Sequence, residues 1–509
     1  MNIQEFFLKK SVKDILAGKK ENDLSRNLGP VNLITLGIGA IVGAGIFVLT
    51  GTVTAQYAGP AIILSFVIGA IACGFAGLCY AEFASLFPVA GSAYTYAYST
   101  LGEIVAWVIG WALVLEYSLM ASTNAVGWSA YMISFLKNLG INIPPEYTNA
   151  YGSVIQLADG STVTGVFNIP AALIILLIST ILISGVKESA KFNNVIVAIK
   201  LVVLLLFVAI GLTHFDSSNM VPFIPENTGK YGEFGWSGIV RGAGIIFFAY
   251  IGFDSVSTAA QEARNPKRDM PIGILGSLAI CTVIYIVVSI TVSGMISYKK
   301  LNVADPIAVA VDVLQMPWLS LAIKIGALAG LTSVMFVSLF GQSRIFYMMA
   351  GDGLLPKAFM KVHPKFRTPY MATILQGLVI SVISGLLPIA MLGELVSMGT
   401  LFAFAVVSGG VIYLRKTQPD LERPFKVPGM PWTPIASILT CFYLMTSLPH
   451  KTWMRFGIWI AVGGFIYAIY GARNSVVRLR ALRETEGGID SKDKAEKSDS
   501  VVWSPQPDL

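Results

Sequence analysis

Two hydrophobic segments of this chain cannot be continuous membrane-spanning helices. Residues 31–57 contain five glycines, and residues 236–261 contain four glycines together with Asp254 in their apolar middle. A spanning helix satisfies its backbone polar groups internally, so a break at mid-membrane leaves amides and carbonyls bare unless they line a cavity or bind a polar ligand. Two interrupted helices in corresponding places of two halves are typical of secondary transporters that bind their ligand at the breaks.

The composition predicts an all-α membrane protein. Of the residues, 55% are hydrophobic and 13% are charged, whereas a soluble domain carries roughly 25% charged residues. Apolar runs of the length that crosses a bilayer recur along the whole chain. We expect twelve transmembrane helices, at residues 31–57, 60–86, 103–135, 168–186, 193–213, 236–261, 271–297, 317–349, 370–389, 391–414, 432–448 and 453–472.

The positive charges of the loops predict the orientation. With twelve spans, both termini lie on one side, and that side carries 27 Lys and Arg residues against six on the other. Cytoplasmic loops are the ones enriched in Lys and Arg. We therefore expect a multi-pass plasma membrane protein with a cytoplasmic N-terminal segment, residues 1–30, and a disordered cytoplasmic tail, residues 473–509. This asymmetry accounts for the net charge of +7 and indicates no nucleic-acid partner.

Nothing in the sequence favours an enzyme or a metal site. The three histidines fall in loops, and the four cysteines fall within the expected spans without metal-ligand spacing. We expect no catalytic residues, no metal and no cofactor, with a proton gradient as the only driving force. A channel is disfavoured because it would need a continuous pore lined by rings of charges or carbonyls.

The first break offers a site for a carboxylate. Gly43 and Gly45 flank Ala44, so an unwound stretch there would expose amides at the N-terminus of the following half-helix, which favours anions. The carbonyl of Ile41, at the end of the preceding half-helix, could accept from an ammonium group. The alternative is that these glycines only allow close helix packing, because Gly39 and Gly43 also fit the small-xxx-small spacing.

The second break offers ligands for an amine. The carbonyls of Phe248, Ala249 and Ile251 precede Gly252 and Asp254. An acid within the membrane is functional by default, but we expect the Asp254 side chain to cap the second half-helix. Amides for a carboxylate and carbonyls for an ammonium together predict binding of an α-amino acid or a small amine-containing analogue.

Two further charges, Glu116 and Lys200, lie deep within the third and fifth expected spans. Burial lowers the pKa of a lysine, because desolvation disfavours its charged form, and such a lysine can change its protonation state during function. We favour proton coupling through Lys200 and Glu116, and the alternative is a structural ion pair between them. Asn124, two helical turns from Glu116, either lines the cavity or makes a bond between helices.

Four strings resemble the signatures of the amino acid–polyamine–organocation superfamily, specifically bacterial-type amino acid permeases of its cationic amino acid transporter branch. They lie at residues 39–47, 80–94, 248–266 and 341–356, and the resemblance covers about residues 25–475. It implies a LeuT-like fold with inverted five-helix repeats, residues 31–213 and 236–414, whose first helices are broken, plus two extra helices within 432–472. It also implies import of amino acids by alternating access. In proton-coupled relatives a lysine on the fifth span replaces a sodium ion, and Lys200 matches that position.

The substrate and the type of transport are less constrained. Ser338 resembles the small residue of cationic amino acid carriers, although its hydroxyl could simply bond back to its own helix. Ala44 departs from the family, in which relatives often carry Ser or Thr. The sequence predicts a proton-coupled importer. Alternatives are an amino acid sensor or a sodium-independent exchanger of amino acids or related amines. The expected partners of this protein are an amino acid and the bilayer. A small membrane partner and a homo-oligomer are left open.

Overall fold

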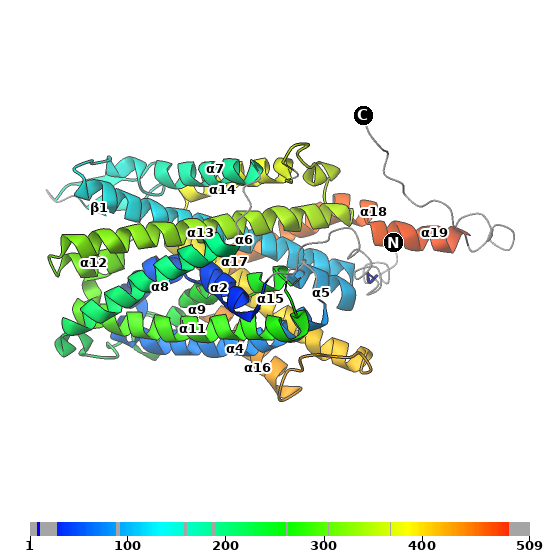
Figure 1. The fold of residues 1–509 in the computed structure, drawn as a ribbon, viewed down its shortest axis with the longest axis horizontal. Coiled ribbons are helices and arrows are strands. Elements are labelled where there is room, and N and C mark those ends of the chain that lie inside the picture. Colours follow the sequence, from blue (N-terminus) through cyan, green and yellow to red (C-terminus); the bar gives the residue numbers. More distant parts are fainter. Residues whose placement is uncertain are drawn as a thin grey trace.

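The computed structural model describes residues 8–10, 28–87, 92–156, 160–184, 190–260, 263–303, 305–366 and 368–487. Most of the expected N-terminal segment and the tail beyond residue 487 lie outside these ranges. The described residues form one elongated bundle of long helices that run mostly along a common direction (Figure 1). The unbroken long helices are α4 (Ile62–Leu86), α6 (Glu103–Asn138), α7 (Ile169–Ile183), α8 (Ala190–Thr213), α11 (Pro266–Met295), α13 (Pro317–Gly351), α14 (Tyr370–Leu386), α15 (Ile389–Thr417), α16 (Trp432–Ser447) and α17 (His450–Ile466).

The two glycine-rich segments are broken, as predicted. In the first, α2 (Pro30–Ile41) ends before an extended Val42, and the chain resumes as π-helical Gly45–Leu49, α3 (Thr50–Val53) and π-helical Thr54–Ala58. In the second, α9 (Gly235–Ile246) leads into a 3-10 turn at Phe247–Tyr250, and α10 (Ser255–Thr258) follows an extended Ile251 and Gly252 at φ +124°. Only glycine adopts that φ readily, so Gly252 fixes the second break.

The surface of the bundle is that of a membrane protein. Eight helical segments of the described chain are long and apolar enough to cross a bilayer, and α2, α7 and α14 are shorter apolar helices. Large apolar side chains point outward from several of them, including Leu173 on α7, Val202 on α8 and Val283 on α11, each more than half exposed. In water such a surface would be unstable, whereas in a bilayer it faces lipid.

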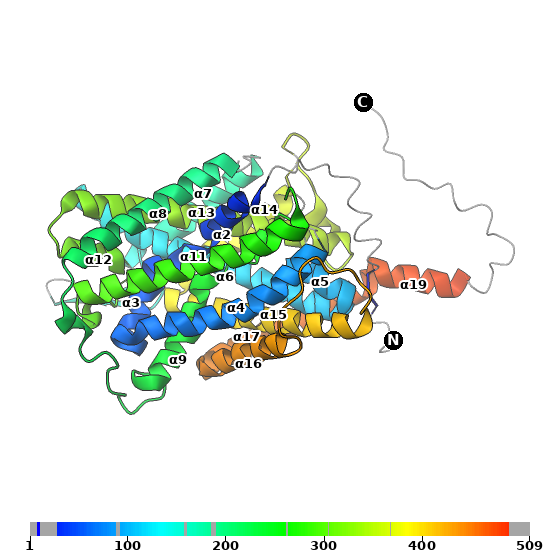
Figure 2. The same cartoon turned by 60° about the horizontal axis from the view of Figure 1, so that its bottom comes forward.

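The long helices pack in pairs, and the pair of α6 and α13 is the most extensive. In addition, α4 packs along α11, and α7 packs along α14 (Figures 1 and 2). α15 adds a further face against α6. The long helices therefore surround the two breaks and shield their unsatisfied backbone groups from lipid.

The two ends of the bundle carry elements that the sequence analysis did not predict. At one end, which we call the terminal end, lie α5 (Ser92–Thr100), α18 (Ala472–Asn474) and α19 (Val476–Gly487). At the other, the hairpin end, lie α12 (Pro306–Asp312) and the antiparallel pair β1 (Val154–Gln156) and β2 (Thr162–Thr164), with Val154 opposite Thr164.

The start of the C-terminal tail is ordered, which corrects the expectation of disorder for residues 476–487. Ser475 accepts a hydrogen bond from the Arg478 amide (3.2 Å) and its hydroxyl bonds the buried carboxylate of Glu103. The Val476 amide donates to the Asp352 carbonyl (3.1 Å). A serine before a helix satisfies one of its free amides, so α19 begins where the chain is tied to α6 and to the end of α13.

Candidate functional site

The two breaks cross each other in backbone contact. A Cβ atom at Gly45 would lie 2.3 Å from the Cα atom of Ala249, and one at Gly252 would lie 2.8 Å from the carbonyl carbon of Ala40. Real Cβ atoms do not approach other atoms so closely, so both positions require glycine. We call this region the crossing, and all of its predicted site residues are buried.

One hydroxyl joins the carbonyls of both breaks. The Tyr285 hydroxyl, on α11, lies 2.9 Å from the Ile41 carbonyl oxygen and 2.9 Å from that of Ala249. A phenol has a single hydrogen to donate. At any moment it can therefore satisfy only one of two carbonyls that the sequence analysis named as amine ligands.

The amides of the first break are only partly free. The Ala44 amide donates to Oδ1 of Asn124 on α6 (2.9 Å), and the Asn124 side-chain amide donates to the Met120 carbonyl (2.8 Å). Asn124 therefore makes a hydrogen bond between helices, which was one of the two roles considered for it. Gly43 faces the same side chain, since a Cβ there would lie 2.6 Å from Asn124 Oδ1.

Asn124 therefore holds the shape of the first break. Its replacement by alanine leaves the buried Ala44 amide without this acceptor, and we expect a loss of about 1–3 kcal/mol of stability. Thermal unfolding of the purified protein measures the change. Asn138→Ala, at the exposed end of the same helix, is the matched control and should leave the unfolding temperature nearly unchanged. Equal unfolding temperatures for both variants would contradict this role.

The second break is stabilised differently from the prediction. Asp254 lies before α10 but does not cap it with its side chain. Instead, Asp254 Oδ1 accepts from the Gly252 amide (3.2 Å), a donor within the break itself. The Phe248 carbonyl accepts from the Ile251 amide (3.2 Å). The carboxylate thus supports the unwound turn before α10.

Lys200 binds the first break directly. Its ammonium group donates to the carbonyls of Gly39 (2.8 Å) and Val42 (3.0 Å), and the side chain is fully buried. These carbonyls belong to the C-terminal end of α2, where a helix lacks internal donors and its dipole favours a cation. Gly330 on α13 provides the space, because a Cβ there would lie 3.3 Å from the Lys200 Cε atom.

Glu116 has different neighbours from Lys200. Asp254 of the second break and the hydroxyl of Thr400 on α15 lie near its carboxyl. The bonds of Lys200 run instead to the end of α2. The ion pair considered between Glu116 and Lys200 is therefore not the arrangement that organises either side chain.

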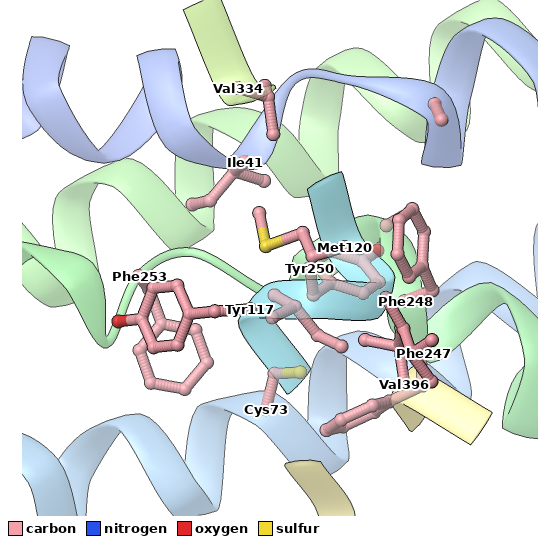
Figure 3. Close-up of a cluster of buried hydrophobic side chains, with 14 of the residues drawn as sticks. Ile41, Cys73, Tyr117, Met120, Phe247, Phe248, Tyr250, Phe253, Val334 and Val396 are labelled. Atoms are coloured by element: carbon pink, nitrogen blue, oxygen red, sulfur yellow. The ribbon is translucent and has the colours of Figure 1, made fainter. Parts of the chain in front are cut away.

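Apolar side chains gather around the crossing. Figure 3 shows Ile41, Met120, Phe248 and Val334 among them, contributed by both breaks, α6 and α13. Ser338 is buried on α13, and its hydroxyl donates to the Val334 carbonyl (2.8 Å). This is the bond back to its own helix that the sequence analysis named as the alternative for Ser338.

A short helix covers the crossing at the hairpin end. A Cβ at Gly51, in α3, would lie 2.4 Å from Pro306 of α12. Asp305, in the loop before α12, is half-buried, and desolvation raises the pKa of its carboxyl although Lys324 nearby lowers it. Lys324 also lies 3.7 Å from Asp312 at the other end of α12. The ion pair between Lys324 and Asp312 holds α12 against α13.

Sequence reasoning missed Tyr285 as a contact of both breaks. It was visible only as a polar residue within the apolar run of residues 271–297, and such a residue can also serve for packing between helices. Its importance depends on the crossing, which brings two carbonyls 208 positions apart in the chain to one hydroxyl.

Comparisons with known proteins identify the family of this chain. Residues 28–466 match the family described as Amino acid permease. The methylthioribose transporter of Bacillus subtilis is 45% identical over 475 residues, 93% of this chain and 100% of that protein. The branched-chain amino acid permease BcaP of the same organism is 45% identical over 471 residues, 92% of this chain and 98% of that protein. The vacuolar cationic amino acid transporter 4 of Arabidopsis thaliana is 36% identical over 403 residues, 78% of this chain and 65% of that protein.

These matches cover the bundle from α2 to α17, including both breaks and the helices around them. They confirm the resemblance drawn from the four sequence strings and exclude an enzyme. The chain belongs to the amino acid permease family of the amino acid–polyamine–organocation superfamily and is a multi-pass membrane protein of a transporter family.

Proposed function

We propose that this protein is a secondary active importer that binds an α-amino acid at the crossing and moves it by alternating access. One observation carries the proposal: backbone groups of two broken helices converge at a single buried point, where the Ile41 and Ala249 carbonyls share the Tyr285 hydroxyl. Broken backbone at mid-membrane is expected only where it serves a ligand or lines a cavity.

The substrate ammonium binds the carbonyls. An ammonium group has three donors, enough to satisfy the Ile41 and Ala249 carbonyls together and to reach that of Phe248 or Ile251. Tyr285 holds one of these acceptors when no substrate is bound. The arrangement therefore selects for a donor-rich cation at this point.

The carboxylate binds the opposite side, at the amides of Gly43 and Gly45. The Ala44 amide donates to Asn124, and this bond preserves the unwound conformation of the break. The half-helix that starts at Gly45 directs the positive end of its dipole toward this point. Because the side chains gathered at the crossing are apolar, an amino acid with an uncharged side chain fits best.

Ligand analogues test this clamp. Radiolabelled leucine is bound to the purified protein, and competitors lacking one charge are added: isoamylamine, which lacks the carboxylate, and isocaproate, which lacks the amine. Each loses charge-assisted hydrogen bonds, so each should compete roughly tenfold to hundredfold more weakly than leucine. Methylthioribose serves as a third competitor. If it competes better than leucine, the substrate is not an amino acid and the clamp is refuted.

The same proposal includes twelve spans in two inverted repeats. Helices occupy each of the twelve ranges predicted from the sequence. The helix pairs α4–α11, α6–α13 and α7–α14 pack together, and the members of each pair are five spans apart. Pairing of equivalent elements supports repeats at residues 31–213 and 236–414, with two extra helices within 432–472. We place both termini in the cytoplasm of a plasma membrane protein, on the basis of the Lys and Arg distribution.

We assign the coupling to Lys200. Protonated, its ammonium occupies the carbonyls at the end of α2; neutral, it releases them, and the break can move. A sodium ion would compete for the same oxygens, so a tethered cation makes sodium unnecessary. Glu116, close to Asp254, is the second group that we assign to proton movement.

Ser338 tests the side-chain pocket. Ser338→Met adds bulk one turn from Val334, which borders Gly43. We expect uptake of lysine, arginine and leucine to fall more than that of alanine, by roughly tenfold, because an overpacked pocket penalises large ligands. Competition assays with the four amino acids measure the ratio. An equal loss for all four would show that Ser338 does not face the pocket.

A further inference from the structure

Four buried hydroxyls in the interior of the bundle have no hydrogen-bond partner in the described part of the chain: Tyr80, Tyr96, Tyr117 and Thr400. Each is at most 2% exposed. They come from four different helices, α4, α5, α6 and α15. Buried hydroxyls are nearly always bonded to protein or to internal water, because leaving them unsatisfied is costly.

These hydroxyls surround two buried acids. The hydroxyls of Tyr80 and Tyr117 both lie near the carboxyls of Asp254 and Glu116. Tyr96 lies near Asp254 and Ser257. The Tyr96 and Tyr117 hydroxyls lie near these neighbours but make no hydrogen bond of good distance and angle with them. Polar groups that are close but not bonded are typically bridged by water.

The other ionisable side chains around Asp254 and Glu116 are tyrosines and cysteines, which become anions when they ionise. The α4 helix contributes Tyr80 and Cys73, α5 contributes Tyr96, and α6 contributes Tyr117 beside Glu116; Cys441 of α16 lies behind Cys73. Within the described ranges no Lys or Arg forms an ion pair with Asp254 or Glu116. Two acids this close cannot both be ionised at low cost without a cation, so the pair is suited to hold a proton.

The hydroxyls form a sequence along the bundle. Tyr117 lies at the depth of the crossing (Figure 3). The Tyr80 ring packs against Phe253 of the second break (centroids 5.8 Å apart) and Phe404 of α15 (5.1 Å). Tyr96 belongs to α5, at the terminal end, and stacks on Phe83 one turn beyond Tyr80 (5.1 Å). The series thus leads from the crossing toward the terminal end.

We propose that Asp254, Glu116 and these hydroxyls form a hydrated path through which the co-transported proton leaves toward the terminal end. A carboxyl O–H gives its proton to a bridging water and becomes a carboxylate, and the water passes a proton onward between the hydroxyls. The path rests on the proposed proton-coupled transport. The tyrosines are positioning residues, because they hold the waters that carry the proton.

The test compares Tyr80→Phe and Tyr96→Phe, singly and together, with the wild type in proteoliposomes. Tyr94→Phe is the matched control: it lies on α5, two residues from Tyr96, but its hydroxyl is bonded to Asp352 (2.8 Å). Three quantities are measured: uptake driven by a proton gradient, its dependence on internal pH, and counterflow exchange of substrate, which needs no net proton movement. Thermal stability is measured in parallel.

We expect the double variant to lose roughly tenfold of its gradient-driven uptake and to shift its internal pH profile. Counterflow should stay near the wild-type rate. Tyr94→Phe should lower thermal stability without changing the pH profile. If the double variant instead is more stable and transports normally, the hydroxyls are dry and the path is overturned.

An equal loss of counterflow and gradient-driven uptake would show a structural role and would also overturn the path. Failure of the underlying transport proposal gives a different result, since the wild type itself would then take up no substrate in counterflow. Wild-type counterflow without any response to the proton gradient would refute both the coupling and the path.

Discussion

Replacing Lys200 by alanine is expected to abolish uptake driven by a proton gradient, by about a hundredfold or more, while substrate binding remains measurable. The ammonium group holds two carbonyls at the end of α2, and its protonation decides whether that end is fixed. Without the amine, the carbonyls have no donor that responds to pH. Lys200→Arg should fail as well, because a guanidinium group stays charged.

Lys324 supplies the control for this experiment. It is also a buried lysine within a helix, but it lies near Asp312 of α12 at the hairpin end. Lys324→Ala should lower stability and leave the coupling to protons intact. Normal accumulation of substrate by Lys200→Ala would leave Lys200 with a purely structural role at the end of α2.

Gly45→Val is expected to eliminate substrate binding, with at least about a hundredfold loss of affinity, while the protein still reaches the membrane. The reason is a collision between the two breaks: the new Cβ would lie 2.3 Å from Ala249 Cα, so the crossing would have to separate. Carbonyls and amides that meet at the crossing would then no longer converge on one ligand, and a loss of several charge-assisted bonds has this magnitude.

Gly464→Val provides the comparison, because no atom lies within 4 Å of a Cβ at that position on α17. Binding of radiolabelled leucine to both purified variants measures the difference, and size-exclusion chromatography checks that both remain monodisperse. If Gly45→Val binds leucine as the wild type does, the crossing is not the substrate site.

The positions of the helices were largely predictable, because apolar runs of membrane length and glycine clusters are local properties of the sequence. Both breaks were found in this way. α5, α12 and α19 were not, because short helices at the ends of a bundle depend on tertiary anchors, such as the bond of Ser475 to Glu103. Helical periodicity alone cannot indicate such an anchor.

The contacts within the site were less predictable than its location. The sequence indicated that Ala44 has a free amide and that Asp254 caps a helix, but the partners are Asn124 and the Gly252 amide. Tyr285 and the contact of Gly45 with Ala249 depend on how two distant segments cross. No local pattern encodes that geometry, and it emerges only when α6, α11 and α13 enclose both breaks.

The most direct test of the whole account is uptake of radiolabelled leucine and alanine into proteoliposomes that contain the purified full chain. Uptake is measured with and without an inward proton gradient, with and without sodium, and with empty or substrate-loaded vesicles. The account predicts accumulation in empty vesicles that requires the proton gradient and is indifferent to sodium. Exchange only into loaded vesicles would identify an antiporter, and binding without uptake would identify a sensor. Sodium-stimulated uptake would contradict the role given to Lys200 at the crossing.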